Sequence, residues 1–366
     1  MRPYLTVEKH QHSTKMVECS KKTRGQFYTT RCDYILSGLG EGQPWKDAAK
    51  IVEPFAGSGD LIAWVRKQDA TVEIEGWDID PKGPGVKQRD TLLDPPDYRD
   101  AWVITNPPYL ARNKCADKTV FDLYDSNDLY KCFIMSLCAS SPRGGILIIP
   151  AGFFLSPRDV DARCREAFMS KFRITRIKYF EETVFDDTTT TVVAVAWERS
   201  PGPLEEQEVP WSRFPSGETR VFTMQKSLDW IIGGDIYRLR GAPGVTVSRH
   251  VQGQAPKKGV SPTFLTLHAL DSGTAAGGRI ALVYEKGVIY PAKDCSRTFA
   301  TLCVSGRPPL TESEQISLAE RFNALVEAKR DETWSLFLPQ YRESKEYARK
   351  RIPFELAYSI VEHLLA

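Results

Sequence analysis

An apolar run followed by two prolines constrains the fold of this chain more than any other stretch. Residues 101–104 (Ala-Trp-Val-Ile) have the length and composition of a buried strand. Because Pro107 and Pro108 donate no ladder hydrogen bond, this strand has to end near Asn106. The asparagine, the prolines and Tyr109 are therefore expected on a rigid turn at the carboxyl end of a strand. That is the edge where open α/β sheets bind ligands.

The residue types on this turn suit an amino group as the ligand. The amide oxygen of Asn106 and the backbone carbonyl of Pro107 can accept both hydrogens of a planar amino group. Such contacts draw its nitrogen toward a tetrahedral, more nucleophilic geometry, and the Tyr109 ring can stack on the plane that carries the group. The alternative is a structural Asx-Pro turn with a tyrosine in the core.

A second turn with ligand-binding character lies upstream. A short strand at 50–52 leads into Glu53-Pro54-Phe55-Ala56-Gly57-Ser58-Gly59, and a helical pattern follows at 61–65. In a strand–turn–helix unit of this kind the backbone can approach a ligand closely. The stretch has no third glycine and no Walker lysine, which disfavours a dinucleotide or nucleoside triphosphate site. The acidic residue before the turn suits a cationic ligand, and a plain tight turn is the alternative.

Two acidic residues further along are placed to contact a nucleoside. Asp78 directly follows the predicted strand 72–77 and lies about 20 residues past the glycine turn. An acidic residue at this position usually holds ribose hydroxyls. Asp90 lies between this strand and the Asn106 turn, which suggests contact with an adenine; a solvated turn is the alternative. Nearer the amino terminus, Phe27 and Tyr28 stand together in a polar stretch, which favours a packed or ligand-contacting loop over a linker.

Strands and helices alternate up to about residue 200. With further strands at 146–150, 174–180 and 190–197, the pattern predicts an open α/β sheet of seven strands with an antiparallel edge. The stretch Ser200-Pro201-Gly202-Pro203 then marks a domain boundary. Beyond it, strands with recurring Gly/Pro turns precede helical segments, so we predict a second, α+β domain over residues 201–366.

The distribution of charge matters more than its total. The chain of 366 residues has a net charge of only +2, so a polyanion would have to bind a local basic face. Residues 226–258 carry six basic and two acidic side chains, and a second basic stretch lies near the carboxyl end. Such runs are often solvated surfaces rather than nucleic-acid contacts. The candidates for phosphate contacts are Lys257, Lys258, Arg349, Lys350 and Arg351.

The cysteine and histidine pattern argues against a metal site. None of the eight cysteines forms a Cys-x-x-Cys pair, and the five histidines are scattered. We therefore expect a reduced, intracellular and soluble protein that uses its thiols as small core residues. No apolar run has the length of a signal-peptide core or a membrane span, so no membrane association is expected.

Taken in order, these motifs resemble the gamma-class S-adenosylmethionine-dependent DNA adenine-N6 methyltransferases, including those of type II restriction–modification systems and related viral enzymes. The order is aromatic loop, glycine turn, acidic strand end and Asn-Pro-Pro-Tyr, followed by a carboxy-terminal domain. The resemblance implies a Rossmann-like methyltransferase sheet and S-adenosyl-L-methionine as the cofactor. It also implies a catalytic domain over residues 20–200 and a target (DNA) recognition domain over residues 201–366.

The resemblance also implies a role for each motif residue. Asp78 would hold the ribose hydroxyls of the cofactor, and Asp90 its adenine amino group. A flipped-out adenine would present its N6 to Asn106 and the Pro107 carbonyl. Thr91 departs from the relatives that place an aromatic against the cofactor adenine. The implied cofactor-binding residues are Phe27, Tyr28, Glu53, Pro54, Gly57, Gly59, Asp78 and Asp90, and the acceptor site comprises Asn106, Pro107, Pro108, Tyr109 and Phe185, whose two aromatics would stack on opposite faces of the base.

The implied chemistry is direct in-line methyl transfer to N6 without a covalent intermediate. No Pro-Cys nucleophile motif is present, which argues against carbon-5 cytosine methylation. Two alternatives use the same pocket for an RNA adenine or for a protein glutamine; the long downstream domain and the aromatic loop argue against glutamine. A third is a non-enzymatic nucleic-acid binder on an inactive methyltransferase fold. The partner implied is double-stranded DNA, with a cognate restriction endonuclease as a further candidate, and we expect a monomer.

Overall fold

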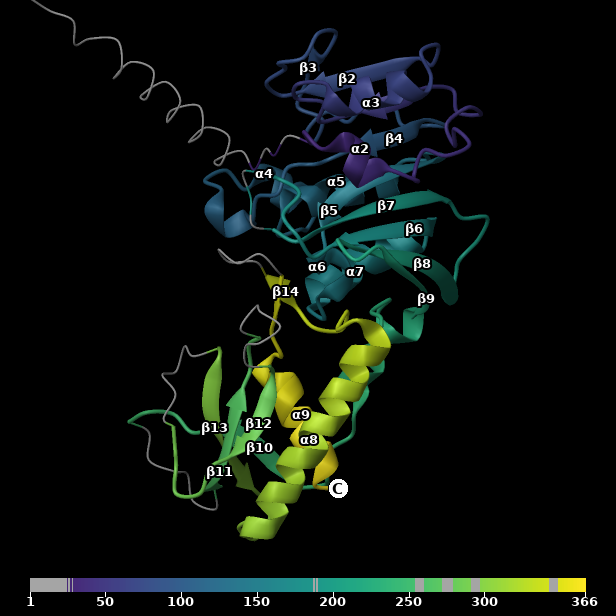
Figure 1. Cartoon of the computed structure of the whole chain (residues 1–366). Helices are drawn as coiled ribbons and strands as arrows, with labels where there is room; N and C mark the ends of the chain where they lie inside the picture. Colours follow the sequence, from purple (N-terminus) through teal and green to yellow (C-terminus); the bar gives the residue numbers. More distant parts are fainter. Residues whose placement is uncertain are drawn as a thin grey trace, which may run out of the picture. The chain divides into compact units, whose positions relative to one another are not determined.

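The computed structural model describes residues 25, 27, 29–186, 188, 190–253, 260–271, 279–290, 297–341 and 348–366 (Figure 1). The chain divides into two compact units. The first comprises Met1–Phe153 and Arg158–Val221, and the second comprises Phe154–Pro157 and Phe222–Ala366. Each unit has an apolar core of its own.

The first unit is built on a nine-stranded sheet in the order β3-β2-β1-β4-β5-β7-β6-β8-β9. Strands β3, β2, β1, β4 and β5 run parallel to one another, whereas β7 pairs antiparallel with both β5 and β6. The strands are β1 Ile51–Glu53, β2 Ile74–Asp78, β3 Lys87–Gln88, β4 Trp102–Thr105, β5 Gly144–Pro150, β6 Phe172–Phe180, β7 Val192–Arg199, β8 Glu206–Phe214 and β9 Glu218–Gln225.

This sheet is larger than the seven strands predicted. The two strands β8 and β9 continue it past residue 200, and Ile177 of β6 pairs in parallel register with Trp211 of β8. Trp211 and Val209 are fully buried, so the segment after Pro201 belongs to the sheet and not to a linker. The antiparallel strand β7 is also internal, between β5 and β6, and not at an edge. The division between the two units falls within β9, after Val221.

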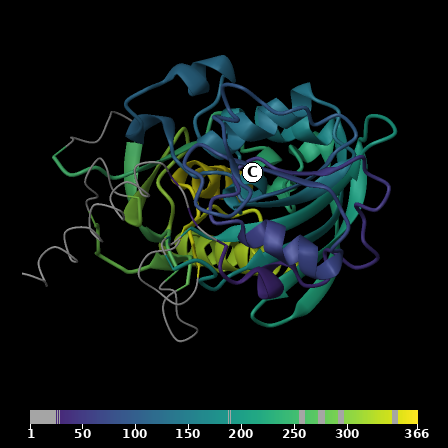
Figure 2. The same cartoon turned by 90° about the horizontal axis from the view of Figure 1, so that it is seen from above.

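Helices cover both faces of the sheet in the first unit. In Figure 2, α2 and α3 lie on one face and α5 and α7 on the other. The apolar face of α3, with Leu61, Trp64 and Val65, packs on alternate sheet residues such as Ile51 and Ile104. The helical segments of this part of the chain are α2 Cys32–Leu36, α3 Asp60–Gln68, the 3-10 turn η1 Arg112–Lys114, α4 Thr119–Leu123, α5 Leu129–Ala139, α6 Gly152–Leu155 and α7 Asp159–Met169.

In its described residues, the second unit combines a four-stranded antiparallel sheet with two α-helices. Its sheet has the order β10-β13-β11-β12, with β10 Thr246–Arg249, β11 Val260–His268, β12 Ala281–Tyr284 and β13 Phe299–Ser305. Short 3-10 turns precede it (η2 Lys226–Leu228, η3 Gly234–Arg238), and β14 Gln340–Tyr341 pairs with β15 Arg349–Lys350.

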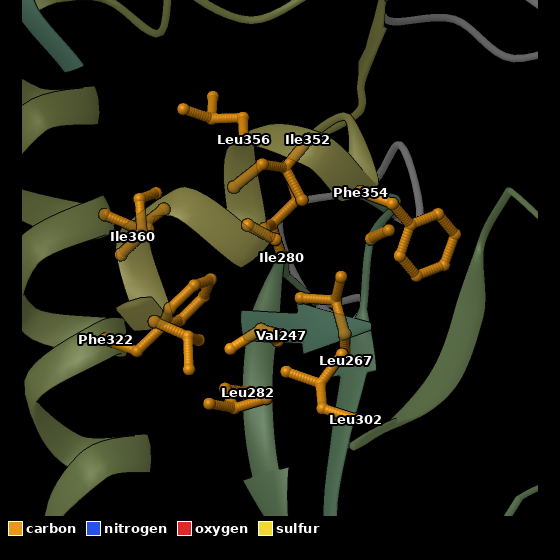
Figure 3. Close-up of a cluster of buried hydrophobic side chains, with 14 of the residues drawn as sticks. Val247, Leu267, Ile280, Leu282, Leu302, Phe322, Ile352, Phe354, Leu356 and Ile360 are labelled. Carbon is orange, nitrogen blue, oxygen red and sulfur yellow. The ribbon is translucent and has the colours of Figure 1, made fainter. Parts of the chain in front are cut away.

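The helices of the second unit, α8 Glu312–Thr333 and α9 Phe354–Leu364, bury their apolar faces against this sheet. Thr311 and Glu314 form a capping box, which satisfies free backbone amides where α8 begins. Figure 3 shows Phe322 of α8 and Ile360 of α9 converging with sheet residues on one core. None of the helices in the described ranges is long and apolar enough to cross a membrane.

Candidate functional site

Three adjacent parallel strands carry the predicted site residues at their carboxyl ends. Strands β2, β1 and β4 are neighbours and end at Asp78, at Glu53 and directly before Asn106. All four residues of β4 are buried, as expected for a central strand. The sheet therefore brings together at one edge the acidic strand end, the glycine turn and the Asn-Pro-Pro-Tyr turn.

Asn106 has a defined set of hydrogen-bond partners. Its Nδ2 donates to the carbonyl oxygen of Phe27 at 2.7 Å and to Thr29 Oγ1 at 3.1 Å. The Tyr109 hydroxyl lies 2.5 Å from Asn106 Oδ1 and 2.7 Å from the carbonyl oxygen of Ile148. Since an amide oxygen can accept two hydrogen bonds, Oδ1 retains acceptor capacity for a ligand.

The Tyr109 ring lies beside Asn106 and contacts two other aromatics. Its centroid is 5.5 Å from that of Phe27 and 6.1 Å from that of Tyr130. Burial raises the pKa of the Tyr109 hydroxyl well above its ordinary value, so this group stays neutral and can donate a proton in a hydrogen bond. The stacking of Tyr109 on an acceptor base remains a prediction.

A largely apolar cavity of about 240 Å³ opens next to the Asn106 turn. Six of the predicted site residues line it: Phe27, Gly57, Asp78, Asp90, Asn106 and Pro108. Its other walls include Phe55, Ile79 and Leu92. An apolar pocket with a few convergent polar groups is the usual form of a small-molecule site. Glu53, Pro54, Gly59 and Phe185 do not line it.

Asp78 braces the glycine turn from the neighbouring strand. Its Oδ2 accepts from the backbone amide of Gly57 at 2.9 Å, and its Oδ1 accepts from the amide of Asp80 at 2.7 Å. Gly57 and Gly59 have φ values of 49° and 87°, in the left-handed region that favours glycine. The sequence separation between Gly57 and Asp78 thus corresponds to a direct hydrogen bond between them.

Asp90 forms a turn and also lines the apolar cavity, while its contact with an adenine stays a prediction. Its Oδ1 accepts from the backbone amides of Leu92 and Leu93 at 3.1 and 3.2 Å, which is a turn held by its own side chain. The same residue lines the apolar cavity. Next to it, Thr91 is buried and donates to the carbonyl oxygen of Pro54 at 2.9 Å, which links this turn to the glycine turn.

Glu53 lies beneath the cavity rather than in it. The side chain is buried, and its Oε1 accepts from Phe55 N at 3.0 Å and from Thr105 Oγ1 at 2.6 Å. Its Oε2 has no hydrogen-bond partner among the described residues. Burial raises the pKa of this carboxyl to about 8. In this structure the predicted cation-binding residue joins the glycine turn to the end of β4.

Replacing Glu53 by glutamine should make stability less dependent on pH. The folded state raises the pKa of Glu53, so between about pH 4.5 and 8 it retains a proton that the unfolded chain releases. Stability conferred by this group therefore falls as pH rises, by at most about 1.4 kcal/mol per pH unit. Glutamine mimics the protonated form. Urea unfolding from pH 5 to 8 should show the free energy of unfolding of Glu53→Gln rising relative to that of the parent as the pH increases. If the free energies of the two proteins changed in parallel with pH, the raised pKa of Glu53 would be contradicted.

Phe185 is placed differently from the expectation. Its side chain is buried and belongs to the apolar cluster that contains Val184, Phe180 and Ile148. It lines neither cavity of the site. The predicted stacking on a base would require the Phe185 ring to leave this cluster, so that role stays a prediction.

A larger cleft of about 1140 Å³ borders the Asn106 turn at Tyr109. Phe27 and Leu110 line both spaces, and Tyr109 lines the larger one. Five cationic side chains and one carboxylate also line the cleft, and burial raises the pKa of that carboxyl, Asp128, to about 6. The cationic residues are Arg112, Lys114, Lys118, Lys131 and Arg158.

Several residues of this cleft were missed by the sequence interpretation. Lys131 is buried, pairs with the buried carboxylate of Asp161 and donates to Asn127 Oδ1 at 2.7 Å. Arg158 also binds Asp161, at 2.8 Å. A single lysine in the apolar helix α5 indicated a buried ion pair. The sequence could not identify the partner of Lys131, because Asp161 lies 30 residues away on α7.

The basic candidates for nucleic-acid contact lie in the second unit. Arg349 and Lys350 form β15, and the Arg349 Nε donates to the carbonyl oxygen of Asp271 at 2.8 Å. Arg351 follows directly, and its backbone amide donates to Pro339. Lys257, Lys258 and Tyr28 fall outside the described residues. Where the structure describes the chain, no group of three or more His, Cys, Asp or Glu side chains could hold a metal ion.

The similarity of this chain to known proteins is found at the level of structure. No protein-family model and no curated protein sequence matches the chain. A modification subunit of a putative type I restriction enzyme from Vibrio vulnificus is similar at a TM-score of 0.42 and 15% identity, over 59% of this chain and 54% of that one. The type IIG restriction endonuclease BpuSI is similar at a TM-score of 0.43 and 16% identity, over 67% of this chain and 39% of that one.

A putative class I S-adenosylmethionine-dependent methyltransferase from Listeria monocytogenes gives a TM-score of 0.39 and 15% identity, over 56% of this chain and 72% of that one. The chain spans about half the length of the Vibrio subunit and less of the BpuSI enzyme.

Proposed function

We propose that this chain transfers the methyl group of S-adenosyl-L-methionine to N6 of a flipped-out adenine in double-stranded DNA. The observation that carries the proposal is that residues of the Asn106 turn line two unlike spaces. Asn106 and Pro108 line an apolar cavity that also contains three carboxylates, Asp78, Asp90 and Asp117, and Tyr109 lines a larger, basic cleft. A methyl donor held in the first and an amine entering through the second would meet at this turn.

The residues of the smaller cavity fit S-adenosyl-L-methionine. Asp78 and Asp90 offer acceptors for ribose hydroxyls and for an adenine amino group, and Phe55, Ile79 and Leu92 offer apolar walls. The left-handed backbone at Gly57 allows close approach of the main chain. When bound, the cofactor supplies an electrophilic methyl group on a sulfonium.

The chain's own contribution is positioning and electrostatics. Asn106 Oδ1 and the Pro107 carbonyl would accept the two hydrogens of the acceptor amine, whose nitrogen becomes positively charged as its bond to carbon forms. Acceptors already oriented toward that charge stabilise it without reorganisation. The proton can leave after transfer, so no general base is needed. The basic residues of the larger cleft favour a nucleic acid as the carrier of the amine.

Nucleoside mass spectrometry tests the proposal directly. The protein is incubated with isotopically labelled cofactor and, separately, with defined DNA duplexes, with RNA and with a glutamine-containing peptide. We expect N6-methyladenine in duplex DNA only. Label in RNA or in glutamine would move the activity to an alternative substrate of the same pocket, and no label in any arm would support a non-enzymatic binder. Asn106→Ala serves as the negative control.

We propose further that the carboxy-terminal part of the chain contacts the duplex. A variant in which Arg349, Lys350 and Arg351 are all replaced by uncharged residues should bind DNA with a weaker dependence on salt. The slope of log affinity against log salt concentration should become less steep by about 0.9 for each phosphate contact that is lost. The reduction should be the same for different sequences, because phosphate contacts position DNA without specifying it. Binding to one duplex at several salt concentrations measures the slope. A slope equal to the parent's would place the DNA elsewhere.

A further inference from the structure

Thr29 contacts the centre of the proposed acceptor site without lining either space. Its side chain is 4% exposed, and its Oγ1 lies 3.1 Å from Asn106 Nδ2. Neither the apolar cavity nor the basic cleft includes Thr29 among its lining residues. This hydroxyl can therefore affect a ligand through its contact with Asn106.

The two partners of Asn106 Nδ2 determine which way the amide faces. A backbone carbonyl can only accept, so the Phe27 oxygen requires the nitrogen of the amide on its side. If the amide turned by half a rotation, Asn106 Oδ1 would face the Phe27 oxygen and two acceptors would repel each other. Thr29 Oγ1 takes the second amide hydrogen. With both hydrogens engaged, Oδ1 points away from the amino-terminal segment and toward Tyr109.

We infer that Thr29 is a positioning residue for methyl transfer, which holds the amide of Asn106 so that Oδ1 faces the acceptor amine. The inference rests on the proposed function and adds to it a residue outside the Asn-Pro-Pro-Tyr turn. A carbonyl alone holds one amide hydrogen and permits the side chain to tilt. A second acceptor removes that freedom, and small errors in orientation are costly in a preorganised site.

The segment that carries Thr29 is itself held on both sides. Tyr109 N donates to the carbonyl oxygen of Gly25 at 2.9 Å. Gly25 has φ 68°, and a Cβ there would lie 2.6 Å from the carbonyl oxygen of Tyr109, so this close approach requires glycine. On the other side, the buried Lys178 of β6 donates to the carbonyl oxygens of Tyr34 and Ser37 at 2.8 and 3.0 Å. Described residues on both sides of Thr29 are thus held by hydrogen bonds to the rest of the first unit.

A matched pair of substitutions tests the role by kinetics. Thr29→Val keeps the branched shape and removes the acceptor, whereas Thr29→Ser keeps the acceptor and removes a methyl group. We expect Thr29→Val to lower kcat about tenfold, the effect of one ordinary net hydrogen bond, with the affinity for S-adenosylhomocysteine unchanged. Thr29→Ser should stay within about threefold of the parent. An equal fall in both variants, or a fall explained by weaker cofactor binding, would overturn the inference.

A second measurement is independent of catalysis. The chain contains four asparagines, Asn106, Asn113, Asn127 and Asn323, so asparagine-selective 15N labelling yields four side-chain amide pairs. The pair missing from Asn106→Ala identifies Asn106. Its hydrogens should exchange slowly with water in the parent and in Thr29→Ser, and at least tenfold faster in Thr29→Val. Thr29→Ala replaces the valine variant if that variant does not fold.

The two measurements separate the inference from the proposed function. Absence of methyl transfer by the parent protein refutes the proposed function and leaves the exchange result standing as a test of the contact. Equal exchange in the parent and in the valine variant refutes the contact even if the parent is active.

Discussion

Asn106→Ala should lower the rate of methyl transfer about a hundredfold and leave cofactor binding nearly unchanged. The removed Oδ1 would contact the acceptor amine, whose nitrogen gains positive charge as the methyl group is transferred. Losing one preorganised charge-stabilising group costs on the order of 3 kcal/mol, or about two powers of ten in rate. Burst or single-turnover kinetics at saturating DNA and cofactor measure the rate, and calorimetry with S-adenosylhomocysteine measures the binding.

The fold gives reason to expect that this variant remains folded. Tyr109 keeps its hydrogen bond to the carbonyl oxygen of Ile148 when Asn106 is shortened, and Gly25 still accepts from Tyr109 N. Thermal unfolding would check this. If turnover fell only as far as cofactor affinity fell, Asn106 would be a cofactor ligand and its proposed contact with the amine would be wrong.

Asp78→Ala should have the opposite effect, with a large decrease in cofactor affinity and a smaller decrease in rate at saturation. Hydrogen bonds to a charged carboxylate contribute about 1.5–3 kcal/mol each, so removing those to the ribose should raise the Kd for S-adenosylhomocysteine about a hundredfold. The substitution also leaves the backbone amides of Gly57 and Asp80 without this acceptor. Part of the effect will therefore come through the shape of the glycine turn.

Asp78→Asn separates the two contributions. Asparagine keeps the size of the side chain and one acceptor for the turn, but it removes the charge that strengthens the bonds to ribose hydroxyls. We expect an affinity between those of the parent and Asp78→Ala, with a melting temperature close to the parent's. Calorimetric affinities equal to the parent's in both variants would refute the ribose assignment. A fall in melting temperature alone would make Asp78 a purely structural residue.

Proline and glycine residues make the candidate site recognisable from local sequence. Pro107 and Pro108 end β4, and Gly57 and Gly59 take the left-handed conformations of the turn after β1. These are local effects, because they depend on the missing amide of proline and the missing Cβ of glycine. The alternation of strands and helices likewise predicted an α/β sheet with parallel strands, since hydrophobic periodicity is a property of neighbouring residues.

What the local pattern could not supply is which distant residues meet. The hydrogen bonds from Thr105 to Glu53 and from Asn106 to Thr29 join residues 52 and 77 positions apart. They exist because β1 and β4 pair in the middle of the sheet and because the amino-terminal segment packs on the Asn106 turn. Sheet order is decided by the packing of the whole unit, so the buried, bracing role of Glu53 was not predictable from its place in a motif.

The same reason explains the remaining differences. Phe185 follows a strand and was placed beside a ligand by its position in the sequence, but its ring is buried in an apolar cluster. Strand β8 lies beyond a stretch rich in proline and glycine, yet Trp211 extends the sheet by pairing with β6. Local residue order is enough to predict where strands end and where the backbone can turn. Which side chains those strand ends bring together depends on the folded sheet, because burial and long-range pairing are properties of the whole assembly of strands.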